Sequence, residues 1–413
     1  MTDADGPRLA TPEEFSEMMG LLDRNFAYER GGMQASLPFA YNPDHSDHHA
    51  IIVQDDRIVS HIGAVPQTLS TGVDGETVEC WGIGGVATDK RYRGNGYMSE
   101  LLEFWFDRMA DEDVPLSDLS GNRQRYAHFG YENVGTEYQY KLTERSFDGD
   151  VTASEAVVGY DADAHLETLH EIHEAEPYRV VRDLDETRTV LGQRDLETFV
   201  YVGDGGDDGT DGGDGSDDEG YGGEDVGQGG YGGAGDPAYV SLTRTSRSRT
   251  VEEFGGSERG LETLLSHVLA LLDLNDLTAR VPPWHPLEPV FSGHSRFWTA
   301  RPHRKFRIND LQAVLEAFEG QLEERWLESG RSDEGSVELA IAGEQSVRIV
   351  YGPDGVSVEP GSDGLEPDVE CERTTMSSLL FGMHDRCAHL RAGDPLLETA
   401  LPLRFFVWAS EHV

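Results

Sequence analysis

Residues 76–111 constrain the fold most tightly, because a strand, a glycine-rich turn and a helix follow one another closely there. The segment ETVECWGIGGVAT (76–88) begins as an alternating strand and then carries three glycines, which often mark a bulge or a close approach of a ligand to the backbone. Behind the turn RYRGNG (91–96), apolar residues recur at helical spacing: Met98, Leu101, Leu102, Trp105, Phe106 and Met109. The pattern predicts an amphipathic helix packed on a sheet.

The turn itself has the residues of an anion site. Gly94 and Gly96 allow positive φ and a close backbone approach to a ligand. The amides of residues 93–98 open the helix, whose dipole favours an anion, and Arg91 and Arg93 add positive charge. The pattern indicates a pyrophosphate site, although Gly-x-Gly turns also accompany helices that bind nothing. It lacks the third glycine of the dinucleotide fingerprint and the Lys-Ser/Thr of a P-loop.

Three α+β (mixed) segments are expected along the chain. Residues 1–145 hold a capped first helix, several strands and the turn described above. Residues 146–298 again mix strands and helices. Residues 299–413 contain helices around a strand meander and finish on FFVWASEHV, an apolar end that predicts a docked terminus.

A glycine- and acid-rich insert interrupts the second segment. Of the 34 residues in 203–236, 16 are Gly and 11 are Asp or Glu, so the segment cannot bury enough apolar surface to fold and is expected to be disordered. The flanking runs 196–202 and 238–244 predict strands, which makes the insert an enlarged hairpin loop. A calcium site in GGDGSDDEG (212–220) is the alternative, but no nine-residue repeat supports it.

The charge balance bears on habitat and partners. There are 78 acidic and 33 basic residues, for a net charge of −45, and only Lys90, Lys141 and Lys305 are lysines. An acidic surface with little lysine indicates a salt-rich cytoplasm, where charge repulsion is screened; an ordinary acidic protein is the alternative. The charge argues against binding nucleic acid or an anionic membrane.

Three sparse cysteines, the lack of an apolar and basic leader, and the lack of a run of ~20 apolar residues lead us to expect a soluble cytoplasmic protein. The loop DHSDHHA (44–50) is rich in metal ligands. However, it precedes a strand, and neighbouring His48 and His49 would point apart on an extended chain. We therefore expect a polar loop and no metal.

The strand, basic glycine turn, helix and the later motif RYAHFGY (125–131) together resemble the acetyl-CoA core of GCN5-related N-acetyltransferases. That resemblance covers residues 1–145 and implies acetyl-CoA as co-substrate. It assigns cofactor contacts to the strand end, the turn, and the loop before RYAHFGY: Val86, Ala87, Thr88, Arg91, Arg93, Gly94, Asn95, Gly96, Tyr97, Met98, Gly121 and Asn122.

The order of the three segments resembles the enhanced-intracellular-survival (Eis) acetyltransferase family. The resemblance implies tandem acetyltransferase folds, the second (146–298) degenerate, with GGSERGLETLL (255–265) in place of its phosphate turn. It also implies a sterol-carrier-protein-like domain at 299–413 and a hexamer. In that family the tyrosine of RYAHFGY, here Tyr126, is the general acid, and the terminal carboxylate, here on Val413, is the general base.

This reading predicts an N-acetyltransferase that acts on a primary amine of a small molecule or peptide by direct attack. Val413 departs from the usually aromatic terminus of the family, but only its main-chain carboxylate is needed. The alternative is a non-catalytic acyl-CoA or lipid-binding module.

Overall fold

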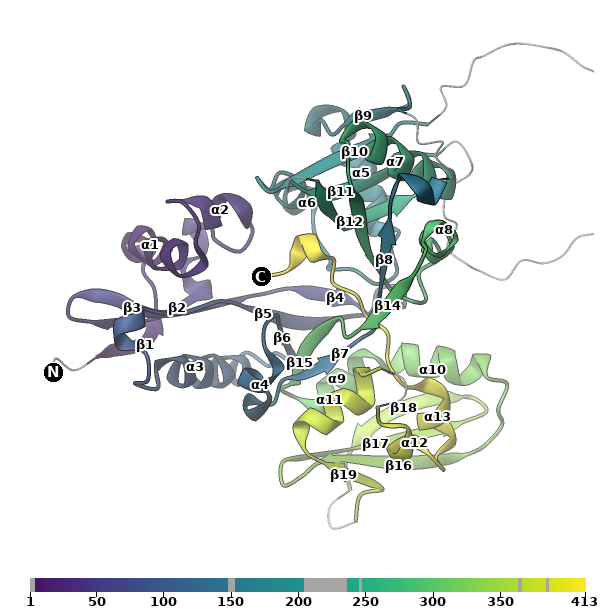
Figure 1. Ribbon diagram of the computed structural model, residues 1–413. Helices are drawn as coiled ribbons and strands as arrows, with labels where there is room; N and C mark the ends of the chain where they lie inside the picture. Colours follow the sequence, from purple (N-terminus) through teal and green to yellow (C-terminus); the bar gives the residue numbers. More distant parts are fainter. Residues whose placement is uncertain (1–3, 148–152, 204–235, 245–246, 363–365, 384–385) are drawn as a thin grey trace, which may run out of the picture.

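The computed structural model describes residues 4–147, 153–203, 236–244, 247–362, 366–383 and 386–413. Three sheets with their helices lie side by side (Figure 1). The expected insert at 203–236 lies, apart from its first and last residues, outside the described residues. No helix within the described ranges is both long and apolar enough to cross a membrane.

The first sheet has eight strands in the order β1-β2-β3-β5-β6-β15-β7, with β4 paired to β5. They are β1 (Asp5–Leu9), β2 (His49–Gln54), β3 (Arg57–Val65), β4 (Thr68–Ser70), β5 (Thr77–Thr88), β6 (Leu116–Leu119), β7 (Glu132–Val134) and β15 (Arg304–Ile308). β5 and β6 run parallel and are joined by α3 (Tyr97–Asp111).

Helices cover both faces of this sheet. On one face lie α1 (Phe15–Phe26) and α2 (Gly32–Ser36), and on the other lies α3 (Figure 1). The alternation along β2 explains this arrangement, because Ala50 and Ile52 join the core under α3 while Ile51 joins the core under α1. The expected cap of the first helix is confirmed: a capping box from Thr11 to Glu14 encloses the turn η1 (Pro12–Glu14) before α1.

The second sheet repeats the parallel pair of the first. Its order is β14-β8-β13-β12-β11-β10-β9, and α7 (Glu258–Leu271) joins the parallel strands β12 and β13. The strands are β8 (Glu137–Leu142), β9 (Val157–Gly159), β10 (Leu196–Tyr201), β11 (Ala238–Thr243), β12 (Ser248–Gly256), β13 (Asp276–Val281) and β14 (Trp298–Arg301). The other helices are α5 (Ala162–Glu174), α6 (Leu184–Leu191) and α8 (Glu288–His294).

The third sheet has the order β18-β17-β16-β19. Its strands are β16 (Gly335–Ile341), β17 (Gln345–Gly352), β18 (Gly355–Pro360) and β19 (Val369–Cys371). Its helices are α9 (Leu311–Ala317), α10 (Glu319–Glu328), α11 (Arg373–Phe381), α12 (Ala388–Arg391) and α13 (Pro395–Ala400). One core joins this part to the first sheet, with Cys80, Leu116 and Phe306 packed among its apolar residues.

The strand pairing differs from the expected division at residues 145 and 298. β8 lies within the expected first domain but pairs with β13 and β14 of the second sheet. β15 lies within the expected third domain but pairs with β6 and β7 of the first sheet. The chain therefore crosses between the first two sheets and returns, and such long-range pairing leaves no local trace in the sequence.

Candidate active site

The parallel pairing of β5 with β6 ends at the glycine-rich part of β5, where β6 itself ends. Their ladder ends at the pair Ile83–Leu119, whereas β5 continues to Thr88. On the other side of β5 the register with β3 shifts between His61 and Gly63, and Gly85 there has a φ of +58°. The expected bulge is therefore present, and it lies just beyond the point where β6 ends.

A pair of buried histidines supports this bulge through hydrogen bonds. His61 Nδ1 lies 2.8 Å from the carbonyl oxygen of Gly85, and His61 Nε2 lies 3.1 Å from His49 Nδ1. Burial lowers the pKa of His61 to about 4 and that of His49 to about 2, so both rings are neutral. His61 then donates to the Gly85 carbonyl, and His49 donates to His61.

Sequence reasoning missed this pair, and the hairpin turn at Asp55 and Asp56 would not have revealed it. In the observed register of β2 against β3, His49 faces Gly63 and Ile51 faces His61. Diagonal neighbours on one face are within reach of long side chains. The register shifts by one residue between Ile52 and Val53, however, so counting back from the turn would have placed the two imidazoles on opposite faces of the hairpin.

The turn after β5 has the geometry expected of an anion site. Gly94 and Gly96 have φ values of +85° and +91°, and no atom lies within 4 Å of the position that a Cβ on Gly94 would occupy. Gly96 is the N-cap of α3, and no side chain caps this helix end. Residues 93–96 are exposed. The amides at the start of α3 therefore face open space.

The neighbouring predicted residues shape this turn. Arg93 Nε donates to the Thr88 carbonyl at 3.1 Å, and Asn95 Nδ2 donates to the Tyr92 carbonyl at 3.1 Å. The side chain of Arg91 is 75% exposed and lies 3.6 Å from Asp89, which leaves it free to move towards an anion. The remaining predicted residues here are in place at the end of β5 and the start of α3: Val86, Ala87, Tyr97 and Met98.

The second sheet has the same strand–helix junction, but its helix start is filled. Ser257 caps α7, and its hydroxyl accepts from the Gly260 amide at 3.2 Å. The same hydroxyl donates to the Asp236 carbonyl at 2.6 Å, and a Cβ on Gly256 would lie 2.3 Å from the Pro237 carbonyl oxygen. The chain itself thus occupies the space that lies open before α3.

The loop after β6 carries the other predicted contacts. Gly121 has a φ of +114°, and Asn122 caps α4 (Arg123–Tyr126) by accepting from the Gln124 amide. Tyr126 is 5% exposed, and its ring meets Tyr131 edge-on, with centroids 6.3 Å apart. Burial raises the pKa of Tyr126, and nearby Arg125 opposes this in part. The hydroxyl therefore keeps its proton at neutral pH.

The end of the chain lies on the bulged strand, as a docked terminus requires. A Cβ on Gly84 would lie 2.8 Å from the carboxyl carbon of Val413, and one on Gly82 would lie 2.9 Å from its Cγ2. Only glycine leaves room for Val413 here. Val413 packs on the core under α1, whereas Tyr126 belongs to the core under α3. The two groups thus lie on opposite faces of the first sheet.

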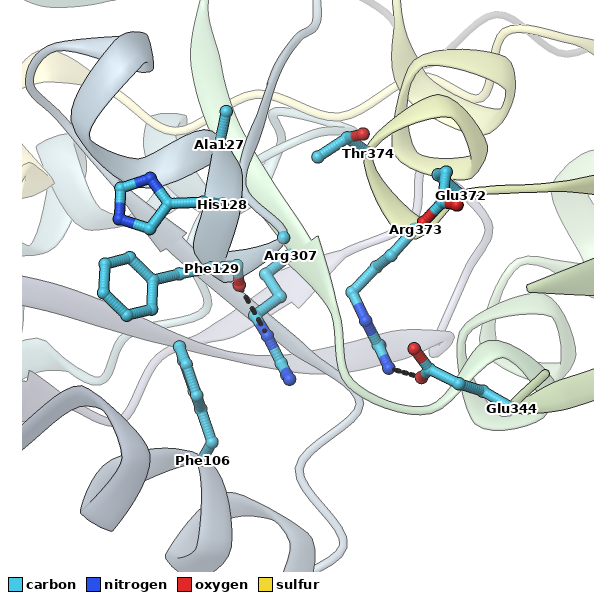
Figure 2. A pocket seen from close by; sticks show the side chains of 10 residues that line it. Phe106, Ala127, His128, Phe129, Arg307, Glu344, Glu372, Arg373 and Thr374 are labelled. Carbon is cyan, nitrogen blue, oxygen red and sulfur yellow. Dashed lines mark hydrogen bonds and ion pairs between the residues drawn. The ribbon is translucent and has the colours of Figure 1, made fainter. Parts of the chain in front are cut away.

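A separate cavity of about 560 Å³ opens between the first sheet and the C-terminal part (Figure 2). Arg307 crosses it, donating to the Phe129 carbonyl at 3.1 Å and lying 4.0 Å above the Phe106 ring. Arg373 pairs with Glu344 on the far side. None of the predicted site residues lines this cavity.

The histidine-rich loop forms the turn η2 (Pro43–His48). It brings ligand atoms of His45, Asp47 and His48 within 4.8 Å of one another, an arrangement that could hold a metal ion. His49 turns away and stacks on Tyr41 instead. The absence of a metal stays a prediction.

Residues 7–134 match the family model of an acetyltransferase (GNAT) domain. No curated protein matches the sequence.

Solved structures match nearly the whole chain. A GCN5-related N-acetyltransferase from Kribbella flavida is 18% identical with a TM-score of 0.66, and each chain is covered to 98%. A probable N-acyltransferase of unknown function from Enterococcus faecalis V583 is 16% identical with a TM-score of 0.64, covering 92% of this chain and 90% of that one. Eis1 from Mycobacterium abscessus is 14% identical with a TM-score of 0.62, at 98% and 99% coverage. At such identities the likeness shows the fold alone.

The family match covers the strands, turn and helix that form the candidate site, and it supports acyl transfer as the activity. GNAT domains use acetyl-CoA as co-substrate, which fits the uncapped helix end that follows β5. Residues 7–134 thus match a GNAT acetyltransferase domain, in a chain whose fold is similar to that of GCN5-related N-acetyltransferases.

Proposed function

We propose that the protein is an acetyl-CoA-dependent N-acetyltransferase that moves the acetyl group to a primary amine by direct attack. The observation that carries the proposal is the open start of α3, with Gly94 and Gly96 at positive φ, directly after β5, which continues beyond the end of its parallel partner β6. Backbone amides at a helix start bind a pyrophosphate. Because β6 ends at Leu119, it does not pair with Val86–Thr88, whose backbone would be exposed on that side to the acyl arm.

Two proton transfers accompany the reaction. The amine nitrogen forms a bond to the thioester carbonyl carbon, the carbon–sulfur bond breaks, and the thiolate leaves. We assign the proton lost by the amine to the terminal carboxylate of Val413, and the proton gained by the thiolate to Tyr126. The position of Val413 on Gly82 and Gly84 supports the first assignment.

The pKa values make these transfers feasible. A tyrosine near 10 gives its proton to a thiolate near 8.5 at a cost of roughly 2 kcal/mol, and the burial of Tyr126 adds to that cost. A terminal carboxylate has a pKa near 3.5 in water. Apolar burial raises the pKa of a carboxyl group, which makes it a stronger base. Val413 packs on such a core through its side chain.

Transfer itself is tested by the release of coenzyme A thiol from acetyl-CoA with a panel of polyamines, aminoglycosides and peptides at high ionic strength. Release that depends on one class of amine is the expected result. Binding of acetyl-CoA without release to any of them would favour the alternative, a non-catalytic acyl-CoA or lipid-binding module. In that module the main function would be lipid binding by the C-terminal part, which we propose to be sterol-carrier-protein-like.

The cofactor site is tested by Gly94→Asp, which places a negative charge where the pyrophosphate would lie. Calorimetry should show a severe loss of acetyl-CoA affinity. Gly75→Asp is the matched control, because Gly75 also has a positive φ, +77°, and open space around it. Equal affinities for the two variants would contradict the pyrophosphate site.

The base is tested by a short tag after Val413, which replaces its carboxylate with an amide and displaces it. Transfer should fall strongly while acetyl-CoA binding persists, and the same tag before Met1 is the control. Equal turnover for the two tagged proteins would rule out the terminal carboxylate.

A further inference from the structure

Buried polar side chains of the second unit surround the last residues of the chain. They come from α5, from the segment before α6, and from strands β11 and β12, and we call them the anchor cluster: His173, Arg182, Tyr239 and Glu253. Arg182 is 4% exposed and Glu253 is fully buried. Arg182 donates to Glu253 at 2.5 Å, and the Tyr239 hydroxyl donates to the same carboxylate at 2.5 Å.

The anchor cluster reaches residues close to the end of the chain. Arg182 donates to Glu411 Oε1 at 3.1 Å, and the Ser410 hydroxyl donates to Glu253 Oε2 at 2.6 Å. Ser410 and Glu411 are both 2% exposed. Two residues of the cluster thus hold two consecutive residues of the terminal segment.

Two glutamines complete the attachment through the backbone. Gln193 donates to the Ser410 carbonyl at 2.6 Å, and Gln67 of the first unit donates to the Glu411 carbonyl at 2.9 Å. Only His412 and Val413 follow Glu411, and Val413 already lies against strand β5. At no more than about 3.6 Å per residue, the tether leaves the terminus little freedom.

The charges of the cluster explain why it holds a fixed geometry. Burial raises the pKa of Glu253, but the interactions with Arg182 and His173 together outweigh burial and lower it, so Glu253 carries the negative charge. Burial raises the pKa of Glu411, and the nearby charge of Glu253 adds to this. A buried ion pair is costly to break, because each ion left alone is desolvated without a partner.

We propose that the anchor cluster positions the terminal carboxylate of Val413 over the bulge of β5, so that the second unit, whose own helix start is filled, serves the reaction of the first. The inference rests on the proposed role of that carboxylate. Arg182 and Glu253 are positioning residues here, acting through Ser410 and Glu411.

Mild variants test the tether, because replacing Arg182 or Glu253 would endanger the fold. Ser410→Ala removes the bond to Glu253, and Gln193→Leu removes the bond to the Ser410 carbonyl. Ser241→Ala is the matched control: Ser241 is a fully buried serine of the same sheet, and its hydroxyl pairs with Thr198 at 2.8 Å and with no residue of the terminal segment in the described part of the chain. All three remove a buried hydrogen bond of the second unit.

The first readout is the rate at which a carboxypeptidase releases Val413, followed by mass spectrometry. The second readout is turnover of acetyl-CoA with an accepted amine, together with the affinity for acetyl-CoA. We expect Ser410→Ala combined with Gln193→Leu to raise the release rate at least about 10-fold and to lower kcat by about 10- to 100-fold, because misplacing a catalytic group by 1 Å has costs of this size. The affinity for acetyl-CoA should stay unchanged, and Ser241→Ala should match the wild type in every readout.

The outcomes separate the tether from the proposed base. Release of Val413 at the wild-type rate from the double variant would overturn the tether, whatever the enzyme's activity. Fast release with unchanged kcat would support the tether and instead contradict the carboxylate as base. Equal losses in the double variant and in Ser241→Ala would overturn the proposal, because they would show a general loss of stability.

Discussion

At the scale of single residues, the candidate site depends on glycines, which have no side chain, as much as on the side chains that it contains. Gly82 and Gly84 leave space for Val413, while Gly85 accepts a bond from His61. Tyr126 packs against Gly121, where a Cβ would lie 3.2 Å from the tyrosine ring. Small residues thus bring the backbone of the site close to the groups that we propose to act on the substrate.

Tyr126→Phe should lower kcat by about 10²–10⁴-fold, as expected for the loss of a general acid, with the affinity for acetyl-CoA near that of the wild type. Tyr131→Phe is the control. Tyr131 is a fully buried tyrosine beside Tyr126, and its hydroxyl bonds Ser117 at 2.9 Å. Steady-state kinetics of both variants test this prediction, and similar kcat values would show that Tyr126 has a structural role and is not the general acid.

The buried imidazole of His61 predicts a pH-dependent stability. Its pKa falls from about 6.5 in the unfolded chain to about 4 in the folded chain. Between these two pH values His61 is therefore protonated in the unfolded chain and neutral in the folded one. The contribution of neutral His61 to the free energy of unfolding is fully present above pH 6.5 and is lost as the pH falls towards 4.

His61→Gln keeps a donor for the Gly85 carbonyl and removes this titration. Between pH 7 and pH 4.5 the wild type should lose more unfolding free energy than the variant, by on the order of 2 kcal/mol. Denaturant titrations at the two pH values measure the difference. Parallel losses would show that His61 is protonated in the fold.

At the scale of elements, local signals were read correctly and distant ones were not. The strand and the helix predicted on either side of the turn RYRGNG are β5, Thr77–Thr88, and α3, Tyr97–Asp111, because alternation and helical spacing define them locally. The tether between Arg182 and Glu411 spans 229 residues. Nothing in either neighbourhood indicates the other, so sequence reasoning could predict a docked terminus but not its partners.

The hairpin β10–β11 predicts that the long insert between its strands is dispensable. Tyr201 pairs directly with Ala238, so the strand ends already lie side by side. Replacing residues 203–236 with a four-residue turn should leave the melting temperature and kcat nearly unchanged, because loop length adds closure entropy only logarithmically. Calorimetry and turnover test this, and a marked drop in the melting temperature would give the insert a stabilising role.

At the scale of the whole molecule, the first sheet needs a strand from beyond the second unit. β15 lies between β6 and β7, and Arg304 at its start forms a buried ion pair with Asp118 of β6. Sheet membership therefore crosses the boundaries that the order of the sequence suggests.

A fragment of residues 1–145 should consequently fail to fold. It would expose the edges of β6 and β7 and leave β8 without β13, and such edges favour aggregation. Soluble expression and amide hydrogen exchange, with residues 1–413 as the control, test this. A soluble and protected fragment would mean that β6 and β7 can pair without β15.

The late position of β15 also sets a schedule for synthesis. β6 leaves the ribosome about 180 residues before β15, which at roughly 5–20 residues per second is a delay on the order of ten to forty seconds. During that interval the first sheet lacks the strand that lies between β6 and β7, and the second unit can fold before the first sheet is complete. The domain that carries the chemistry begins translation first and is completed only after its neighbour.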